Sequence, residues 1–81
     1  MSNASQNRAF RIGLKAARQG VGYTLDDLAG ELGETDAAVS LETLTAWESG
    51  KEAPREWDRP SIEAIERAVG AEGALVEALG W

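Results

Sequence analysis

The side chains of this 81-residue chain that could do chemistry are acidic and basic, because the sequence contains no cysteine and no histidine. The missing thiol and imidazole groups exclude disulfides, zinc–thiolate sites and every Ser–His or Cys–His nucleophile. Fourteen Asp and Glu residues stand against eight Lys and Arg residues, which gives a formal net charge of −6. These counts favour a binding or regulatory module over an enzyme.

Two local patterns that resemble catalytic motifs have a structural explanation. Asp26 and Asp27 form a carboxylate pair, but they follow Thr24 at a predicted helix start, where acidic groups cap the helix and oppose its dipole. Gly20 and Gly22 do not have the spacing of a phosphate-binding glycine loop. We therefore expect no enzymatic activity, no metal and no cofactor.

The basic residues are concentrated in two segments of the chain. Four follow one another at i, i+3, i+7 and i+10 in the first predicted helix, namely Arg8, Arg11, Lys15 and Arg18. Three follow the third predicted helix, namely Lys51, Arg55 and Arg59. The chain from Ser61 onward carries Arg67 against four glutamates, which are Glu63, Glu66, Glu72 and Glu77. This distribution indicates one basic side and one acidic side.

Helical spacing of apolar residues runs through the whole chain. It predicts five short helices, from Phe10 to Val21, Leu25 to Leu32, Leu41 to Ser49, Ser61 to Val69, and Leu75 to Leu79. Thr24 with Asp27 predicts a capping box for the second helix, and Ser40 predicts a cap for the third. We expect a disordered N-terminus over residues 1–7 and one compact all-α domain over residues 8–81. No apolar run approaches the roughly 20 residues of a membrane span.

Several segments carry a recognisable pattern: Leu14-Lys15-Ala16-Ala17-Arg18, Gly22 to Ala29, Leu32-Gly33, and Val39 to Lys51 followed by Pro54. Together they resemble the helix-turn-helix domains of the phage-repressor and Cro family, also called the XRE type. The most specific part is the run Trp47-Glu48-Ser49-Gly50-Lys51. The resemblance covers about residues 9–79 and implies a lambda-repressor-like five-helix bundle.

The resemblance implies structural roles for four residues. In the family, the arginine that ends the first helix pairs with the glutamate of the Trp-Glu-x-Gly segment, which implies an ion pair between Arg18 and Glu48. Trp47 would pack inside the bundle, and Gly50 would take the left-handed conformation that follows many helices.

The resemblance also implies binding to double-stranded DNA, with the third helix in the major groove. The residues that would face the bases are Leu41, Glu42, Thr43, Thr45 and Ala46. The residues that would hold phosphates are Arg11, Lys15, Lys51 and Arg55. The leading prediction is thus a cytoplasmic transcriptional regulator of bacterial or phage type, a repressor or an antitoxin-like protein, which binds DNA as a homodimer.

The sequence departs from the family pattern at the DNA-facing positions. The family favours Gln, Ser, Arg and Lys there, whereas Leu41 and Ala46 offer only apolar contact. Glu42 can accept a hydrogen bond from cytosine but is repelled by phosphates. Five extra residues, Glu34–Ala38, separate the second helix from the third. They either lengthen the turn or extend the third helix backwards from Thr35 or Asp36.

The aromatic residues outside the helical pattern keep an alternative function open. We expect Tyr23 in the core, whereas Trp57 and Trp81 either fold back over the bundle or contact a protein partner. Together with the acidic substitutions, they favour a protein-interaction module that keeps the helix-turn-helix scaffold but has weak or no DNA binding. Binding to mixed duplex at low salt would separate the two functions.

Overall fold

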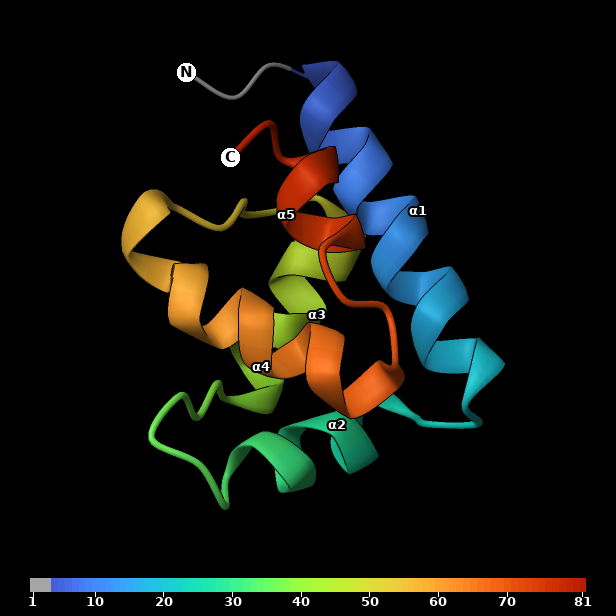
Figure 1. Cartoon of the computed structure of the whole chain (residues 1–81), viewed down its shortest axis with the longest axis vertical. Coiled ribbons are helices and arrows are strands. Elements are labelled where there is room, and N and C mark those ends of the chain that lie inside the picture. Colours follow the sequence, from blue (N-terminus) through green and yellow to red (C-terminus); the bar gives the residue numbers. More distant parts are fainter. Residues whose placement is uncertain (1–3) are drawn as a thin grey trace.

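The computed structural model of the chain describes residues 4–81, and its regular structure there is helical (Figure 1). The elements in chain order are α1 (Ala4–Gly20), α2 (Leu25–Leu32), α3 (Leu41–Ser49), the 3-10 helix η1 (Glu56–Asp58), α4 (Arg59–Val69) and α5 (Ala74–Ala78). The predicted all-helical architecture is therefore confirmed for this part of the chain. None of these helices is long and apolar enough to cross a membrane.

The starts of α2 and α3 are fixed by the side-chain caps that the sequence predicts. Thr24 Oγ1 accepts a hydrogen bond from the Asp27 amide at 3.0 Å, and Asp27 Oδ2 accepts one from the Thr24 amide at 3.0 Å. At the start of α3, Ser40 Oγ accepts from the Thr43 amide at 3.1 Å. These oxygens satisfy amide groups that a first helical turn leaves unpaired.

The five extra residues between α2 and α3 lengthen the turn and do not extend the helix, because α3 begins at Leu41. The turn is held to the end of α2 by Thr35, whose hydroxyl donates to the Leu32 carbonyl at 2.8 Å and accepts from the Ala37 amide at 3.1 Å. Ala37 and Val39 are half-buried and pack against the core. The turn is therefore a folded part of the domain.

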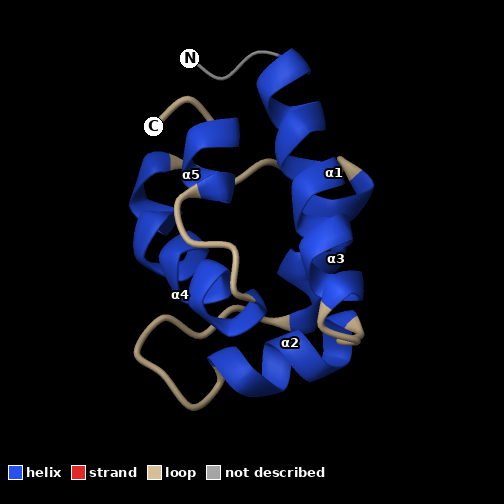
Figure 2. Cartoon of the chain, turned by 45° about the vertical axis from the view of Figure 1, so that its right-hand side comes forward, coloured by secondary structure: helices blue, strands red, loops and turns tan. Residues whose placement is uncertain are grey.

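One hydrophobic core lies where the helices meet. In Figure 2, α1 and α3 lie on one side, α4 and α5 on the other, and α2 crosses one end of the molecule. The largest fully buried side chains are Phe10, Leu14, Leu28, Leu32, Leu44, Ile62, Ile65, Leu75 and Leu79. The Phe10 and Trp47 rings meet edge to face, with centroids 6.2 Å apart at an angle of 74°. This contact joins α1 to α3.

The N-terminal end of α1 differs from its prediction. The sequence predicts disorder over residues 1–7, but residues 4–7 are helical, and residues 1–3 lie outside the described part of the chain. Tertiary contacts explain the difference, because Gln6 lies against Gly80 and Asn7 is half-buried. Packing against the C-terminal end of the domain thus stabilises the first turn of α1, whose polar sequence does not by itself predict a helix.

The C-terminal end of α1 also differs, because Val21 is not on the buried face of the helix. The helix ends at Gly20, and Val21 is 45% exposed. The Tyr23 amide donates to the Arg18 carbonyl at 3.0 Å, and Gly22 has a φ of 75°. These features turn the chain away from the core before Val21 can continue the apolar stripe.

Candidate nucleic-acid interface

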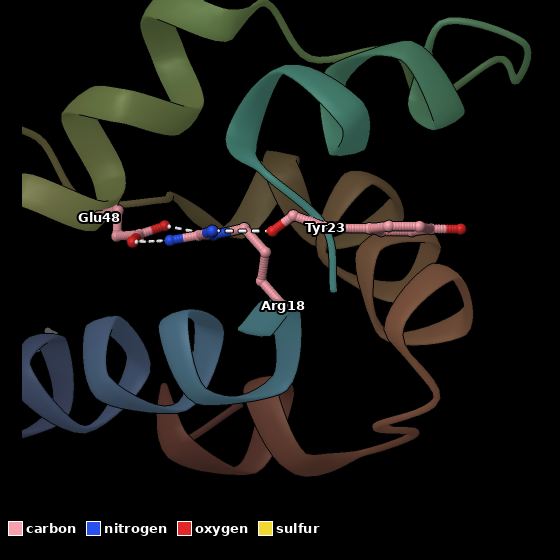
Figure 3. Close-up of polar contacts among 3 residues, drawn as sticks. All are labelled: Arg18, Tyr23 and Glu48. Atoms are coloured by element: carbon pink, nitrogen blue, oxygen red, sulfur yellow. Dashed lines mark hydrogen bonds and ion pairs between the residues drawn. The ribbon is translucent and has the colours of Figure 1, made fainter. Parts of the chain in front are cut away.

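The position of α3 is set by a half-buried ion pair with α1 (Figure 3). Arg18 Nη2 lies 2.6 Å from Glu48 Oε1, and Arg18 Nε donates to Glu48 Oε2 at 3.1 Å. Arg18 Nη1 donates to the Tyr23 carbonyl at 2.8 Å, on the other side of the guanidinium. Both charged side chains are 13% exposed. The ion pair implied by the resemblance is therefore present, and it links α1, α3 and the chain that enters α2.

The end of α3 brings a second arginine of α1 close to the helix. Gly50 has a φ of 85°, as expected for the residue after the helix. A Cβ at Gly50 would lie 2.8 Å from Arg11 Nη1, so the glycine also makes room for this guanidinium. Trp47 is 3% exposed and belongs to the core. Trp47, Glu48 and Gly50 thus shape the scaffold.

The first turns of α3 present four of the five residues that the resemblance assigns to the bases. Leu41, Glu42 and Thr45 are exposed, and Thr43 is half-buried. The hydroxyl groups already take part in the helix, because Thr45 Oγ1 donates to the Leu41 carbonyl at 2.7 Å and Ser40 Oγ donates to Thr43 Oγ1 at 3.0 Å. Each threonine oxygen keeps accepting capacity for a partner.

The fifth residue predicted to face the bases, Ala46, is buried. Its side chain is 7% exposed, so almost none of it is available to a partner. The chain folds back after α3 at this point, and the Glu52 amide donates to the Ala46 carbonyl at 3.2 Å. The exposed residues of α3 are Leu41, Glu42, Thr45 and Ser49.

Two of the predicted phosphate-binding residues come together at the C-terminal end of α3. Arg11 of α1 and Lys51 line the same pocket of about 360 Å³. Lys15 is exposed one helical turn further along α1. Arg55 is exposed on the segment after α3, and its guanidinium carbon lies 5.5 Å from the centroid of the Trp57 ring. The two basic segments of the sequence thus meet beside one helix.

The acidic residues fall into two groups. Glu34 and Asp36 are exposed in the turn that leads into α3, so negative charge does stand near the proposed interface. Glu66, in contrast, is 4% exposed and does not contribute to an acidic surface. Its Oε2 accepts from the Leu75 amide at 2.8 Å and from the Val76 amide at 3.0 Å. This carboxylate caps the start of α5, a role that sequence spacing does not reveal.

The aromatic residues divide between core and surface. Tyr23 and Trp81 are half-buried and pack against the core, whereas Trp57 is 75% exposed and does not fold back over the bundle. Asn7, which the sequence places in a disordered segment, lies beside Arg11 in the same pocket. Asn7 and Arg11 are four residues apart, so a first helix predicted to begin before Asn7 would have placed the two side chains on one face.

No protein-family model, curated protein or solved structure matches the chain. The resemblance to the phage-repressor and Cro family therefore stays a prediction, and the demonstrated fold is a compact all-helical domain. Within residues 4–81, no group of three or more acidic side chains is placed to hold a metal ion. The arrangement of exposed groups around α3 is what can support a function.

Proposed function

We propose that the chain is a sequence-specific DNA-binding transcriptional regulator that inserts α3 into the major groove. The observation that carries the proposal is the meeting of Arg11 and Lys51, which come from distant segments, in one pocket at the end of α3. The chain has a net charge of −6, and these cations nevertheless lie together at one end of α3. Cations gathered beside an exposed helix favour contact with a phosphate backbone there.

In this proposal the two kinds of contact come from different residues. The phosphates would be held by Arg11, Lys15, Lys51 and Arg55, which position the domain without reading sequence. The exposed residues of α3 would read the bases. Glu42 can accept a hydrogen bond from cytosine N4, Leu41 can contact a thymine methyl group, and Thr45 can pair with several base edges.

The proposal includes a homodimer, because two copies of one domain can read two half-sites about 34 Å apart. The described chain measures 30 × 24 × 23 Å, so one domain is about as long as the separation of the half-sites. Occupancy of such an operator, in the cytoplasm of a bacterium or of a phage host, would block or recruit polymerase.

The salt dependence of binding to a mixed-sequence duplex tests this function. Four phosphate-binding cations per subunit should give a slope of log K against log salt of about −3 to −4 per subunit. Fluorescence anisotropy of a labelled duplex, measured from about 50 to 200 mM salt, gives that slope. The proposal fails if the protein does not bind the duplex at the lowest salt.

A second function, a protein-interaction module without DNA binding, is favoured by one observation. Leu41 is 42% exposed at the start of α3, next to Glu42 and near the acidic turn. An exposed leucine among acidic groups suits a protein partner with an apolar and basic surface. Absence of duplex binding at low salt, together with an intact fold, would favour this function.

A further inference from the structure

A groove lies beside the proposed DNA-binding surface, with residues from the start of α1 and from the C-terminal end of the chain in its lining. Figure 1 shows these two ends of the chain on the same side of the molecule. The groove consists of two adjoining pockets, the pocket of about 360 Å³ that contains Arg11 and Lys51, and one of about 540 Å³. Asn7, Ala53 and Pro54 line both pockets, so the two are neighbours. We call them together the indole groove, after the two tryptophans in its larger part.

The larger part of the indole groove is lined by Trp57 and Trp81. Trp57 is 75% exposed, in contrast to Trp47, which is 3% exposed in the core. The guanidinium of Arg55 lies 5.5 Å from the centroid of the Trp57 ring. Most of the indole stays in solvent despite this contact. The exposed indole is therefore available to a ligand, and it shares the groove with a second tryptophan and with basic side chains.

The smaller part of the groove carries positive charge and lies beside two buried polar atoms without partners. Arg11 and Lys51 line this part against Glu52, so its side chains carry a net positive charge in an acidic protein. Among the described residues, two buried side-chain atoms have no hydrogen-bond partner, Asn7 Oδ1 and Arg11 Nε. Both residues line this groove, and buried polar atoms without partners are uncommon in folded proteins.

We propose that the indole groove binds a nucleotide. Its base would stack on Trp57, and its phosphate would lie toward Arg11 and Lys51. Aromatic rings beside a positively charged groove are the features by which proteins hold unpaired nucleotides without sequence preference. A free nucleotide and an unpaired nucleotide of a single strand present the same chemistry, a planar base and a phosphate. The nucleotide site shares Arg11 and Lys51 with the proposed duplex surface. It adds Trp57, Trp81 and Asn7, which the duplex proposal does not use, so substitutions of the aromatic part test the nucleotide site by itself.

The two sources can be separated with two probes, thymidine monophosphate and an oligothymidylate. Both are titrated into the full chain at low salt, with quenching of tryptophan fluorescence and anisotropy of the labelled oligonucleotide as readouts. Quenching by both probes assigns the groove to a nucleotide, and quenching by the oligonucleotide alone assigns it to a single strand. The proposal is overturned if neither probe binds.

The substitution Trp57→Ala identifies the site. It should weaken oligonucleotide binding about 5- to 150-fold, which is the range for the loss of one base–aromatic stack. Trp57→Phe should keep most of the binding, because a phenyl ring also stacks. The matched control is Ile12→Ala, which removes a 59% exposed apolar side chain from α1 and should leave binding unchanged. Wild-type affinity in Trp57→Ala would overturn the proposal.

Two further measurements keep this result distinct from duplex binding and from self-association. Trp57→Ala also removes the ring beside Arg55, so duplex and oligonucleotide affinities are measured for the same variants. A loss of oligonucleotide binding much larger than the loss of duplex binding assigns the effect to the groove, and equal losses would overturn that assignment. Sedimentation of the wild-type chain, with and without oligothymidylate, tests whether Trp57 is covered by a second copy. A dimer that depends on Trp57 and persists with the oligonucleotide would contradict the nucleotide site.

Discussion

The junction of α1 with α3 and the segment after α3 each hold an arginine, but the two arginines have opposite environments. Arg18 is 13% exposed and makes three hydrogen bonds, two to Glu48 and one to the Tyr23 carbonyl. Arg55 is exposed, and its guanidinium lies over the Trp57 ring. Because three hydrogen bonds hold the Arg18 guanidinium inside the fold, Arg18 stabilises the scaffold. Arg55 remains accessible to an anionic partner.

The largest expected effect comes from breaking the scaffold pair. Glu48→Ala leaves the guanidinium of Arg18 half-buried without its carboxylate and should lower the free energy of unfolding by about 3 kcal/mol. Glu63→Ala is the matched control, because it removes an exposed ion pair in which Arg59 Nε lies 3.6 Å from Glu63 Oε2. The control should cost less than about 1 kcal/mol. Urea unfolding measures the free energy of unfolding of both variants. Equal losses would show that the Arg18–Glu48 pair stabilises the fold no more than an exposed ion pair does.

Substitution of Gly50, the glycine after α3, should have a smaller effect on the free energy of unfolding. Comparison with a second glycine separates backbone strain from crowding of the new β-carbon. Gly50→Ala places a β-carbon on a residue with a φ of 85° and 2.8 Å from Arg11 Nη1. Gly22→Ala is the matched control, because Gly22 has a φ of 75° but nothing within 4 Å of its Cβ position. Each should lose about 1–2 kcal/mol from strain. Only Gly50→Ala should also weaken duplex binding, because it displaces Arg11; equal duplex affinity of the two variants would contradict that.

The exposed cations should affect binding and not folding. The double variant Lys51→Ala, Arg55→Ala removes two proposed phosphate contacts and should make the salt slope less steep by about 2. Its free energy of unfolding should change by no more than about 0.5 kcal/mol, because both side chains are exposed. Affinity should fall equally for all duplex sequences, and a loss confined to one sequence would contradict phosphate contact.

The smallest effect comes from the exposed face of α3. Glu42→Gln removes an exposed negative charge from the proposed groove-facing helix and should strengthen non-specific duplex binding about two- to fivefold. Glu77→Gln makes the same change in net charge on α5, where Glu77 is exposed. It should have a smaller effect at the same salt. Equal effects of the two variants would mean that α3 does not face the duplex.

The parts of the fold that depend on local chemistry could be predicted from the sequence. Thr24 and Asp27 cap α2 as their three-residue spacing indicates, and Gly50 ends α3 in the left-handed conformation. The Arg18–Glu48 pair was implied by the resemblance and is present. These features follow from residue spacing within one helix or from a segment that resembles a known family. A single sequence is therefore enough to predict them.

The parts that depend on tertiary packing could not be predicted. Asn7 is helical because α1 packs against the C-terminal end of the domain. Glu66 is buried because the distant amides of Leu75 and Val76 share its carboxylate. In each case the deciding contact comes from a separate element of the fold, which spacing along one helix does not encode.

Selection from a random duplex pool tests the central proposal most directly. The purified chain is incubated with the pool at low salt, and the retained duplexes are sequenced. The proposed regulator should enrich one motif, a palindrome with half-sites one helical turn apart, and Glu42→Gln should change the bases enriched within each half-site. Retention of no duplex at low salt by the folded protein would contradict DNA binding and would leave the acidic turn and Leu41 as a surface for a protein partner.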